Sequence, residues 1–321
     1  MNPTYYLFYY YTTGEITMIN YTVNIDTLKL QINFINSSKQ REVMDRLARA
    51  LHTTYPFLKV NYNTNPIPNG AYTHTVNTGR TKILELTSGA YKDLYKRTIY
   101  YITVEIAGLK QYHRNDKIAH DCLIRLVAYL NTNQIGFEYT GIDIAVDMEC
   151  PFRYVYAFCN KKAAGVKYYK VYERQPYPTS HYVEKYNHTH HDVMKRSYLY
   201  DKSIKENNIT YPLTRFELKL QSSFFNRYPY RWGMLQNELD RYHILYFPTL
   251  DEKDTALSIY ATHEESIRRR DLHKLGLDRY RLFPNTSEIE CFLTELYNVY
   301  EHDLKLPVPV VDNSWLDEYF D

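Results

Sequence analysis

Tyrosines flanked by cations on one predicted strand are the residues of this sequence best suited to chemistry. In the segment RSYLYDK, residues 196–202, the strand period of two places four side chains on a shared face: Arg196, Tyr198, Tyr200 and Lys202. Arginine and lysine neutralise phosphate oxygens and favour a phenolate over a phenol, whose pKa is about 10 in water. The segment therefore has the composition of a phosphoryl acceptor.

Two acidic side chains share a face of a second predicted strand, YTGIDIAVD at residues 139–147. Alternation puts Asp143 and Asp147 together and sends the isoleucines and the valine to the other face. At roughly 3.3 Å per residue, the two carboxylates would lie about 13 Å apart, which is too far to hold one ion together. At most one of them is expected to ligate a metal directly, unless the strand bends.

A third segment, TRFELKL at residues 214–220, places Arg215, Glu217 and Lys219 on one face. Taken alone, the segment is most simply a half-buried strand with a solvated charged face, and the same interpretation applies to the other two segments. Their order along the chain favours a functional interpretation instead, because an aspartate strand is followed by a Tyr-Asp-Lys strand and then by an Arg-x-Glu strand.

This ordered set resembles the Rep_trans family, the replication initiators of rolling-circle plasmids from Gram-positive bacteria and the related relaxases of conjugative elements. The family segment T-R-L-D-hydrophobic-A-hydrophobic-D is matched by residues 140–147, with Gly141 in place of the arginine. Residues 200–206 match a Tyr-Asn/Asp-Lys segment followed by acidic residues, and residues 215–220 match R-hydrophobic-E-hydrophobic-x-L. The resemblance covers residues 21–220. Filamentous-phage replication proteins also carry Tyr-Asp-Lys segments.

The resemblance implies that Tyr200 attacks a DNA phosphodiester, forms a 5′-phosphotyrosine and releases a 3′-hydroxyl that a polymerase extends. The rival nucleophile is Tyr198, two residues earlier on the same predicted face. The resemblance also implies that Asp143 and Glu217 hold a Mg²⁺ or Mn²⁺ ion, with Asp147 as a further candidate. Hard carboxylate oxygens suit these ions.

The function that the resemblance implies is metal-dependent nicking and rejoining of DNA, which initiates rolling-circle replication or conjugative transfer. The expected partners are origin DNA as a single strand or hairpin, a second copy of the chain, and a host helicase and polymerase. Two alternatives remain open. A non-catalytic DNA-binding protein would form no covalent adduct, and a hydrolytic nuclease that uses carboxylates and a metal would leave the 5′ phosphate free.

Candidate DNA contacts lie in a basic, tyrosine-rich stretch, residues 153–202, which holds ten Lys or Arg against four Asp or Glu. Such a surface can track phosphates and stack bases. A solvated lysine-rich loop, and a genome that favours Tyr codons, explain the stretch and the 36 tyrosines equally well. The candidates for DNA binding are Lys167, Lys170, Lys195, Tyr198 and Arg215, and those for phosphate clamps are Arg196, Lys202 and Arg215.

Other polar clusters have simpler explanations. The histidines His188, His190 and His191 could form a competing metal site, but their polar neighbours predict a loop. The basic residues 268–270 are expected on a solvated helix face, with duplex DNA as the alternative partner. The sequence has no glycine-rich phosphate loop, so a built-in helicase motor is not expected.

The predicted elements indicate an α+β fold, an antiparallel β-sheet with helices packed on one face. Strands are expected at residues 23–34, 72–76, 82–87, 100–106, 137–148, 197–202 and 213–220, helices at residues 37–51 and 116–130, and a loop at residues 61–70. The two passes of strands and helix allow a pseudo-symmetric arrangement. The expected domains are an N-terminal extension at 1–20, a catalytic nicking domain at 21–225 and a mainly helical C-terminal region at 226–321 for origin recognition or dimerisation.

The composition excludes several classes of protein. The chain has 321 residues, of which 44% are hydrophobic and 24% charged, and its mean hydropathy is −0.54. It has no apolar run near the roughly 18 residues that a membrane span needs. Membrane-spanning, collagenous and disordered classes are therefore excluded. With four cysteines, no C-x-x-C spacing and no leader pattern at Met1, a reduced, cytoplasmic protein is expected.

Overall fold

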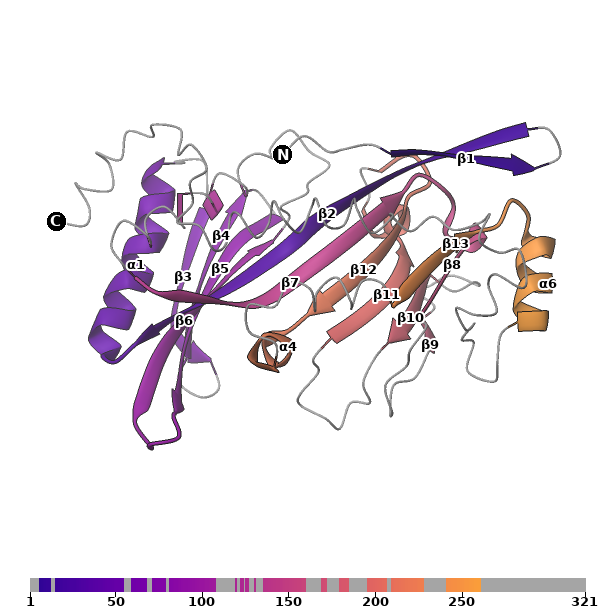
Figure 1. Ribbon diagram of the computed structural model, residues 1–321. Coiled ribbons are helices and arrows are strands. Elements are labelled where there is room, and N and C mark those ends of the chain that lie inside the picture. Colours follow the sequence, from indigo (N-terminus) through magenta and orange to yellow (C-terminus); the bar gives the residue numbers. More distant parts are fainter. Residues whose placement is uncertain are drawn as a thin grey trace. The chain divides into compact units, whose positions relative to one another are not determined.

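The computed structural model describes most of the chain up to residue 260 (Figure 1). The described residues are 6–12, 15–54, 59–67, 71–78, 81–107, 135–159, 169–171, 179–184, 195–206, 209–227 and 241–260, together with 119, 122, 123, 125, 126 and 130. They form two compact units. Unit 1 comprises residues 1–24 and 143–294, and unit 2 comprises residues 25–142 and 295–321. Two long strands, β2 (Glu15–Phe34) and β7 (Phe137–Met148), contribute residues to both units.

Unit 2 contains an antiparallel sheet with helix α1 packed across it. The strands pair in the order β3, β4, β5, β6 and β2, and helix α1 contacts β3, β4, β5 and β6 (Figure 1). Asn36 accepts a hydrogen bond of 2.8 Å from the backbone N–H of Ser38 and so caps α1. The bounds are α1 (Ser37–Thr54), β3 (Lys59–Ile67), β4 (Ala71–Thr78), β5 (Thr81–Lys92) and β6 (Thr98–Ala107).

The core of unit 2 follows from the alternation of its strands. Strand β2 buries Leu28, Leu30 and Ile32, and β6 buries every second residue. Helix α1 buries one side, which carries Val43, Met44, Leu47 and Ala48. The helix expected at residues 116–130 is confirmed where it is described, because Cys122, Leu126 and Leu130 are helical and buried at helical spacing.

Unit 1 is built on strands β7, β12, β11, β10 and β9, which lie side by side in that order (Figure 1). Its strands are β1 (Tyr6–Thr12), β8 (Val155–Cys159), β9 (Tyr169–Val171), β10 (Ser180–Glu184), β11 (Lys195–Asp201), β12 (Thr214–Leu220) and β13 (Tyr242–Tyr246). Its helices are the single turn η1 (Phe152–Tyr154), α3 (Lys202–Lys205), α4 (Ser222–Arg227) and α6 (Leu250–Tyr260). The antiparallel α+β arrangement confirms the predicted fold class.

Three predicted features differ from the structure. Residues 59–67 form β3 rather than a loop; β3 is the last strand of its sheet, and Pro66 sits where the register shifts, the two places where a strand tolerates proline. The expected N-terminal extension contains β1, whose residues pair with Glu15–Tyr21 of β2. A strand, β13, lies in the region expected to be helical and pairs with β8.

The structure contains no helix, among the residues it describes, that is both long and apolar enough to cross a membrane. Cys122 and Cys150 are buried and are not joined in a disulfide, and burial raises the pKa of the Cys150 thiol to about 12. A thiol with such a pKa is not a nucleophile near neutral pH.

Candidate active site

The sheet of unit 1 brings the three predicted segments together on neighbouring strands. Strand β11 pairs with β12 so that Tyr198 stands opposite Glu217 and Tyr200 opposite Arg215. Strand β7, which carries Asp143 and Asp147, lies on the other side of β12. Because partners opposite each other in a sheet point to the same face, the tyrosines and the acidic residue of β12 share one side.

The other face of these strands is apolar and covered. Phe216 of β12 packs its ring against Tyr242 of β13, with 5.5 Å between ring centroids, and Tyr156 of β8 contacts His181 of β10. Leu199 and Leu218 on this face are fully buried. The two-stranded sheet of β8 and β13 therefore covers the apolar face, and the charged segments meet on the opposite one.

The cluster of charges on that face is buried rather than solvated. The guanidinium of Arg215 donates two hydrogen bonds to Asp147, from Nε to Oδ1 at 2.7 Å and from a terminal nitrogen to Oδ2 at 2.9 Å. Only 1% of Arg215 and 3% of Asp147 is exposed. Arg215, predicted as a phosphate clamp and DNA contact, is therefore a buried structural partner of Asp147 and does not reach a surface where DNA could bind.

Lys219 stands between two carboxylates of different strands. Its ammonium nitrogen lies 2.8 Å from Oδ2 of Asp143 and 3.0 Å from Oε1 of Glu217. Burial disfavours the charged ammonium, but the two negative charges outweigh burial and raise the pKa of Lys219 above its usual value. Burial likewise opposes ionisation of Glu217, yet Lys219 and a hydrogen bond from Tyr198 hold its pKa below the usual range.

Tyr198 contacts the same carboxylate. Its hydroxyl donates a hydrogen bond of 2.7 Å to Oε2 of Glu217. Burial, and then the negative charge of Glu217, raise the pKa of Tyr198 well above that of a free phenol. Tyr198 is therefore a neutral hydrogen-bond donor at physiological pH.

Three tyrosine rings form a stacked row across β10 and β11. Tyr182 stacks on Tyr198 with centroids 5.1 Å apart, and Tyr198 stacks on Tyr200 at 5.4 Å. The ammonium of Lys205, in the short helix α3, lies 4.2 Å from the centre of the Tyr200 ring and 6.0 Å from that of Tyr198. Tyr200 is 5% exposed, so the ammonium of Lys205 lies over a largely buried ring.

The two other predicted clamps differ in their surroundings. Lys202 does not share the face of Tyr200 as expected, because β11 ends at Asp201 and Lys202 begins α3, where its ammonium pairs with Glu206 at 2.5 Å. Arg196 stands opposite Lys219 in the register, and its Nε is buried with no hydrogen-bond partner. A buried donor of this kind is suited to an incoming phosphate oxygen.

The carboxylates fit a divalent ion only in part. Asp143 and Glu217 point at a common position, which the ammonium of Lys219 takes, so the pair could hold a Mg²⁺ or Mn²⁺ ion in place of that ammonium. Both oxygens of Asp147 accept hydrogen bonds from the guanidinium of Arg215, whose positive charge opposes the binding of a cation beside it. In the described part of the chain, no three His, Cys, Asp or Glu side chains form a group that could hold a metal.

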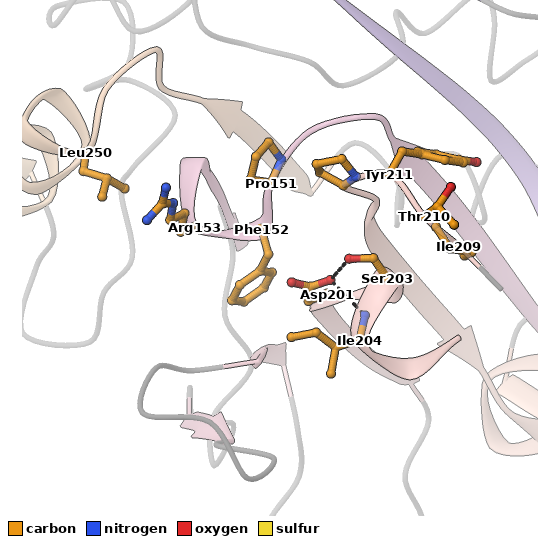
Figure 2. A pocket seen from close by; sticks show the side chains of 11 residues that line it. Pro151, Phe152, Arg153, Asp201, Ser203, Ile204, Ile209, Thr210, Tyr211 and Leu250 are labelled. Carbon is orange, nitrogen blue, oxygen red and sulfur yellow. Dashed lines mark hydrogen bonds between the residues drawn. The ribbon is translucent and has the colours of Figure 1, made fainter. Parts of the chain in front are cut away.

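A pocket of about 750 Å³ opens beside the Tyr-Asp-Lys segment (Figure 2). Asp201 lines it and caps α3, since its Oδ1 accepts hydrogen bonds from Oγ of Ser203 at 2.5 Å and from the backbone N–H of Ile204 at 3.2 Å. The remaining walls include Phe152, Arg153 and Tyr211. Successive residues of a strand point to opposite faces, so the side chains of Asp201 and Tyr200 point in opposite directions. The pocket that Asp201 lines is therefore separate from the charged cluster on the face of Tyr200.

Several predicted residues lie outside the described part of the chain or have no described side chain. Lys167, the histidines His188, His190 and His191, and residues 268–270 lie outside it. Lys170 in β9 and Lys195 in β11 are placed by their backbone pairing alone, opposite His181 and Leu220. Their roles in DNA binding stay predictions.

Two cations of the cluster, Lys219 and Lys205, are not among the predicted site residues. The period of two places Lys219 on the face of Glu217 but does not identify its partner on the neighbouring strand, Asp143. The alternation of β11 cannot predict the position of Lys205, because this residue belongs to the helix α3 that follows the strand. The turn into α3 places the Lys205 ammonium over the Tyr200 ring.

Comparison with known proteins leaves the family unassigned. No family model matches the chain, and no curated protein matches it. Among solved structures, the chain is similar to a rolling circle replication initiator protein from Geobacillus stearothermophilus, with a TM-score of 0.39 and 13% identity over 81% of this chain and 97% of that one. A likeness of this strength carries no argument about function, so the Rep_trans resemblance rests on the motif residues.

Proposed function

We propose that the chain nicks and rejoins single strands of DNA with a tyrosine nucleophile and so initiates rolling-circle replication or conjugative transfer. The observation that supports this function is the shared face of β7, β11 and β12. There, the Tyr198 hydroxyl bonds to Glu217, whose other oxygen shares the ammonium of Lys219 with Asp143. The Tyr200 ring stacks on Tyr198 and has the ammonium of Lys205 over it.

The two tyrosines have different surroundings, and these support different roles. The Tyr198 hydroxyl is held by Glu217, whose charge disfavours a phenolate. Tyr200 has the ammonium of Lys205 at 4.2 Å from its ring, and a cation favours negative charge developing nearby. We therefore assign Tyr200 as the nucleophile and Tyr198 as a positioning residue that holds Glu217 in place.

In the reaction, the phenol oxygen of Tyr200 attacks the phosphorus of one phosphodiester. The bond from phosphorus to the 3′ oxygen breaks, a 5′-phosphotyrosine forms, and the phenol proton leaves while the 3′ oxygen gains a proton. Arg196 is placed to neutralise a phosphate oxygen through its unpartnered Nε. Reversal by a free 3′-hydroxyl restores the phosphodiester, because the phosphotyrosine conserves the energy of the broken bond.

A metal ion would act through Asp143 and Glu217. When bound, Mg²⁺ or Mn²⁺ supplies charge neutralisation at the scissile phosphate. The chain's own contribution is to orient Glu217, which Tyr198 does through its hydroxyl. The ammonium of Lys219 occupies the position between the two carboxylates until an ion displaces it. The second copy of the chain, the host helicase and the host polymerase are proposed as partners on the motif resemblance.

Incubation of the full chain with labelled single-stranded origin DNA and Mn²⁺ tests the proposal. A protein–DNA band that resists denaturant is expected, and mass spectrometry of the adduct should place the DNA on Tyr200. Tyr200→Phe should abolish the band, while Tyr198→Phe, the matched control with the same loss of a hydroxyl, should weaken it. A full-strength adduct in Tyr200→Phe would remove the assignment.

The alternatives give different products in the same assay. A hydrolytic nuclease would cut the strand and leave a free 5′ phosphate with no protein attached. A non-catalytic binding protein would shift the DNA under native conditions with a steep dependence on salt and leave it intact.

A further inference from the structure

The end of the hairpin formed by β5 and β6 carries exposed apolar side chains. Leu94 is 98% exposed, Tyr95 80%, and Tyr91 45%. Ile35, just after β2, is 89% exposed at the same end of unit 2, since its neighbour Phe34 pairs with Tyr100 of β6. Scattered exposed apolar residues are ordinary, but four of the five large ones in the described chain gather here.

This end of the hairpin is a free two-stranded ribbon. Strand β4 pairs with β5 only as far as Thr87, and β2 pairs with β6 only from Tyr100 onward. Beyond these, Tyr91 and Lys92 pair with Ile99 and Thr98 and with no further strand among the described residues. A two-stranded β-ribbon is one of the shapes that the major groove of DNA admits, at about 12 Å in width.

The turn at the tip is held in one conformation. Oδ1 of Asp93 accepts hydrogen bonds of 2.9 Å from the backbone N–H groups of Tyr95 and Arg97, and its Oδ2 accepts one of 2.7 Å from Nε of Arg97. Lys96 adopts a left-handed φ of 61°, which a non-glycine residue keeps only where its surroundings fix it. Leu94 and Tyr95 are therefore presented to solvent by an ordered turn.

The base of the ribbon is held by hydrogen bonds from helix α1. Nε2 of Gln40, from α1, donates hydrogen bonds to the carbonyl oxygens of Gly89 at 2.9 Å and Tyr101 at 2.6 Å. The Tyr101 ring covers Gly89 so closely that a Cβ there would lie 2.3 Å from the ring. The ribbon thus projects from unit 2 beyond a hydrogen-bonded base (Figure 1).

Positive charge surrounds the exposed apolar side chains. Residues 92–97 contain three cations, Lys92, Lys96 and Arg97, against one acid, Asp93. All three cations are exposed, and within the described chain neither lysine forms an ion pair. Cations beside exposed apolar side chains are the composition of a surface that holds phosphates and contacts bases.

We propose that the hairpin end, residues 91–99, binds duplex DNA by entering a groove. Lys92 and Lys96 contact phosphates, and Leu94 and Tyr95 contact base edges. The proposal rests on the proposed function in one respect, because a protein that nicks one strand must also locate its site in a duplex. It places duplex binding in unit 2, whereas the sequence predicts origin recognition or dimerisation at residues 226–321.

Fluorescence anisotropy with labelled duplex DNA of random sequence tests this inference on the full chain. Lys92→Gln combined with Lys96→Gln should weaken binding roughly tenfold and lower the slope of log affinity against log salt by about 1.8, the value for two phosphate contacts. Leu94→Ser combined with Tyr95→Ser should weaken binding severalfold and leave the slope unchanged. Lys39→Gln combined with Arg49→Gln, two exposed cations of α1, is the matched control and should change neither quantity.

Three outcomes would overturn the inference. Duplex binding could be equal in the hairpin variants and the control. The Leu94 and Tyr95 variant could lose binding to anionic lipid vesicles instead, which would make the tip a membrane contact. The same variant could dissociate a dimer in sedimentation without changing DNA binding, which would make the tip a contact between copies.

The nicking assay separates this inference from the proposed function. Hairpin variants should still nick single-stranded DNA, and Tyr200→Phe should lose nicking while keeping wild-type duplex affinity. If no nicking occurs in any form of the protein but the hairpin variants still lose duplex binding, the proposed function fails and the hairpin inference stands.

Discussion

The hydroxyl of Tyr198 and the carboxylate of Glu217 form a hydrogen bond of 2.7 Å between directly opposed residues of β11 and β12. The other oxygen of Glu217 lies 3.0 Å from the ammonium of Lys219, so both oxygens of a buried carboxylate have a donor. A buried acceptor that loses one of two donors is destabilised by more than the bond itself contributes.

Tyr198→Phe should lower the free energy of unfolding by about 1.5–3 kcal/mol, the range for hydrogen bonds to charged groups. Urea denaturation measures the change. Tyr91→Phe, which removes a hydroxyl from an exposed tyrosine, is the control and should be near neutral. Equal stability of the two variants would show that the bond to Glu217 contributes nothing.

Asp147→Ala should destabilise unit 1 by about 3–5 kcal/mol, because it leaves the buried guanidinium of Arg215 without its counter-charge. Adding Arg215→Met should recover much of that loss, since the uncompensated charge is then gone. Glu42→Gln, which breaks the exposed pair with Arg46, should cost less than about 1 kcal/mol. A double variant no more stable than Asp147→Ala would contradict this account of the pair.

The stability of unit 2 should depend on pH through Glu105. Burial opposes ionisation of Glu105, but Lys29 and Lys82 outweigh it and hold the pKa below its usual value of 4.5. A carboxyl with a lowered folded-state pKa stabilises the fold above its unfolded pKa and loses that contribution as pH falls through the folded one. Glu105→Gln should therefore be less stable than the wild type near neutral pH and lose less stability on acidification.

Urea denaturation at a series of pH values from neutral downward checks this dependence. Glu138→Gln removes a charge from an exposed position of β7 and should lose as much stability on acidification as the wild type. If Glu105→Gln and the wild type lose stability in parallel below pH 4.5, Lys29 and Lys82 do not stabilise the ionised form.

Mn²⁺ should compete with Lys219 for the position between Asp143 and Glu217. Lys219→Met removes the ammonium and keeps most of the side-chain volume, so it should bind Mn²⁺ at least roughly tenfold more tightly than the wild type, about 1.4 kcal/mol. Isothermal titration calorimetry measures the affinity. Lys205→Met removes a cation that lies over the tyrosine rings and should leave the affinity for Mn²⁺ unchanged. Equal affinities of Lys219→Met and the wild type would place the ion elsewhere.

The period of two was enough to predict the strands that carry the site. Residues 137–148 are β7 as expected, and the strands predicted at 197–202 and 213–220 match β11 and β12 within two residues. The faces were predicted correctly as well, because side chains alternate along any extended strand. The prediction failed for Lys202, since the end of β11 depends on Asp201 capping α3, a tertiary detail that alternation does not contain.

The failures have physical causes that lie outside local sequence. Pro66 and the asparagines of residues 61–70 disfavour a central strand, but an edge strand needs hydrogen bonds on one side only. The segment YHILY of β13 is too short for its apolar run to distinguish a strand from a helix. The partner of each charge, such as Arg215 with Asp147, depends on which strands become neighbours, and no spacing within one segment encodes that.

The two ion pairs between β7 and β12 have a consequence for how the strands find their alignment. Asp143 of β7 pairs with Lys219 of β12, and Asp147 of β7 pairs with Arg215 of β12. The two acids are four residues apart, and so are the two bases, which follow in the opposite order because the strands run antiparallel. Sliding either strand by two residues would keep the faces but set an aspartate against Glu217, burying like charges. The two alignments that differ from the native one by two residues are therefore less stable than the native alignment during folding. These strands also carry the carboxylates of the proposed site, so the same ion pairs that fix the register also fix the position of those carboxylates.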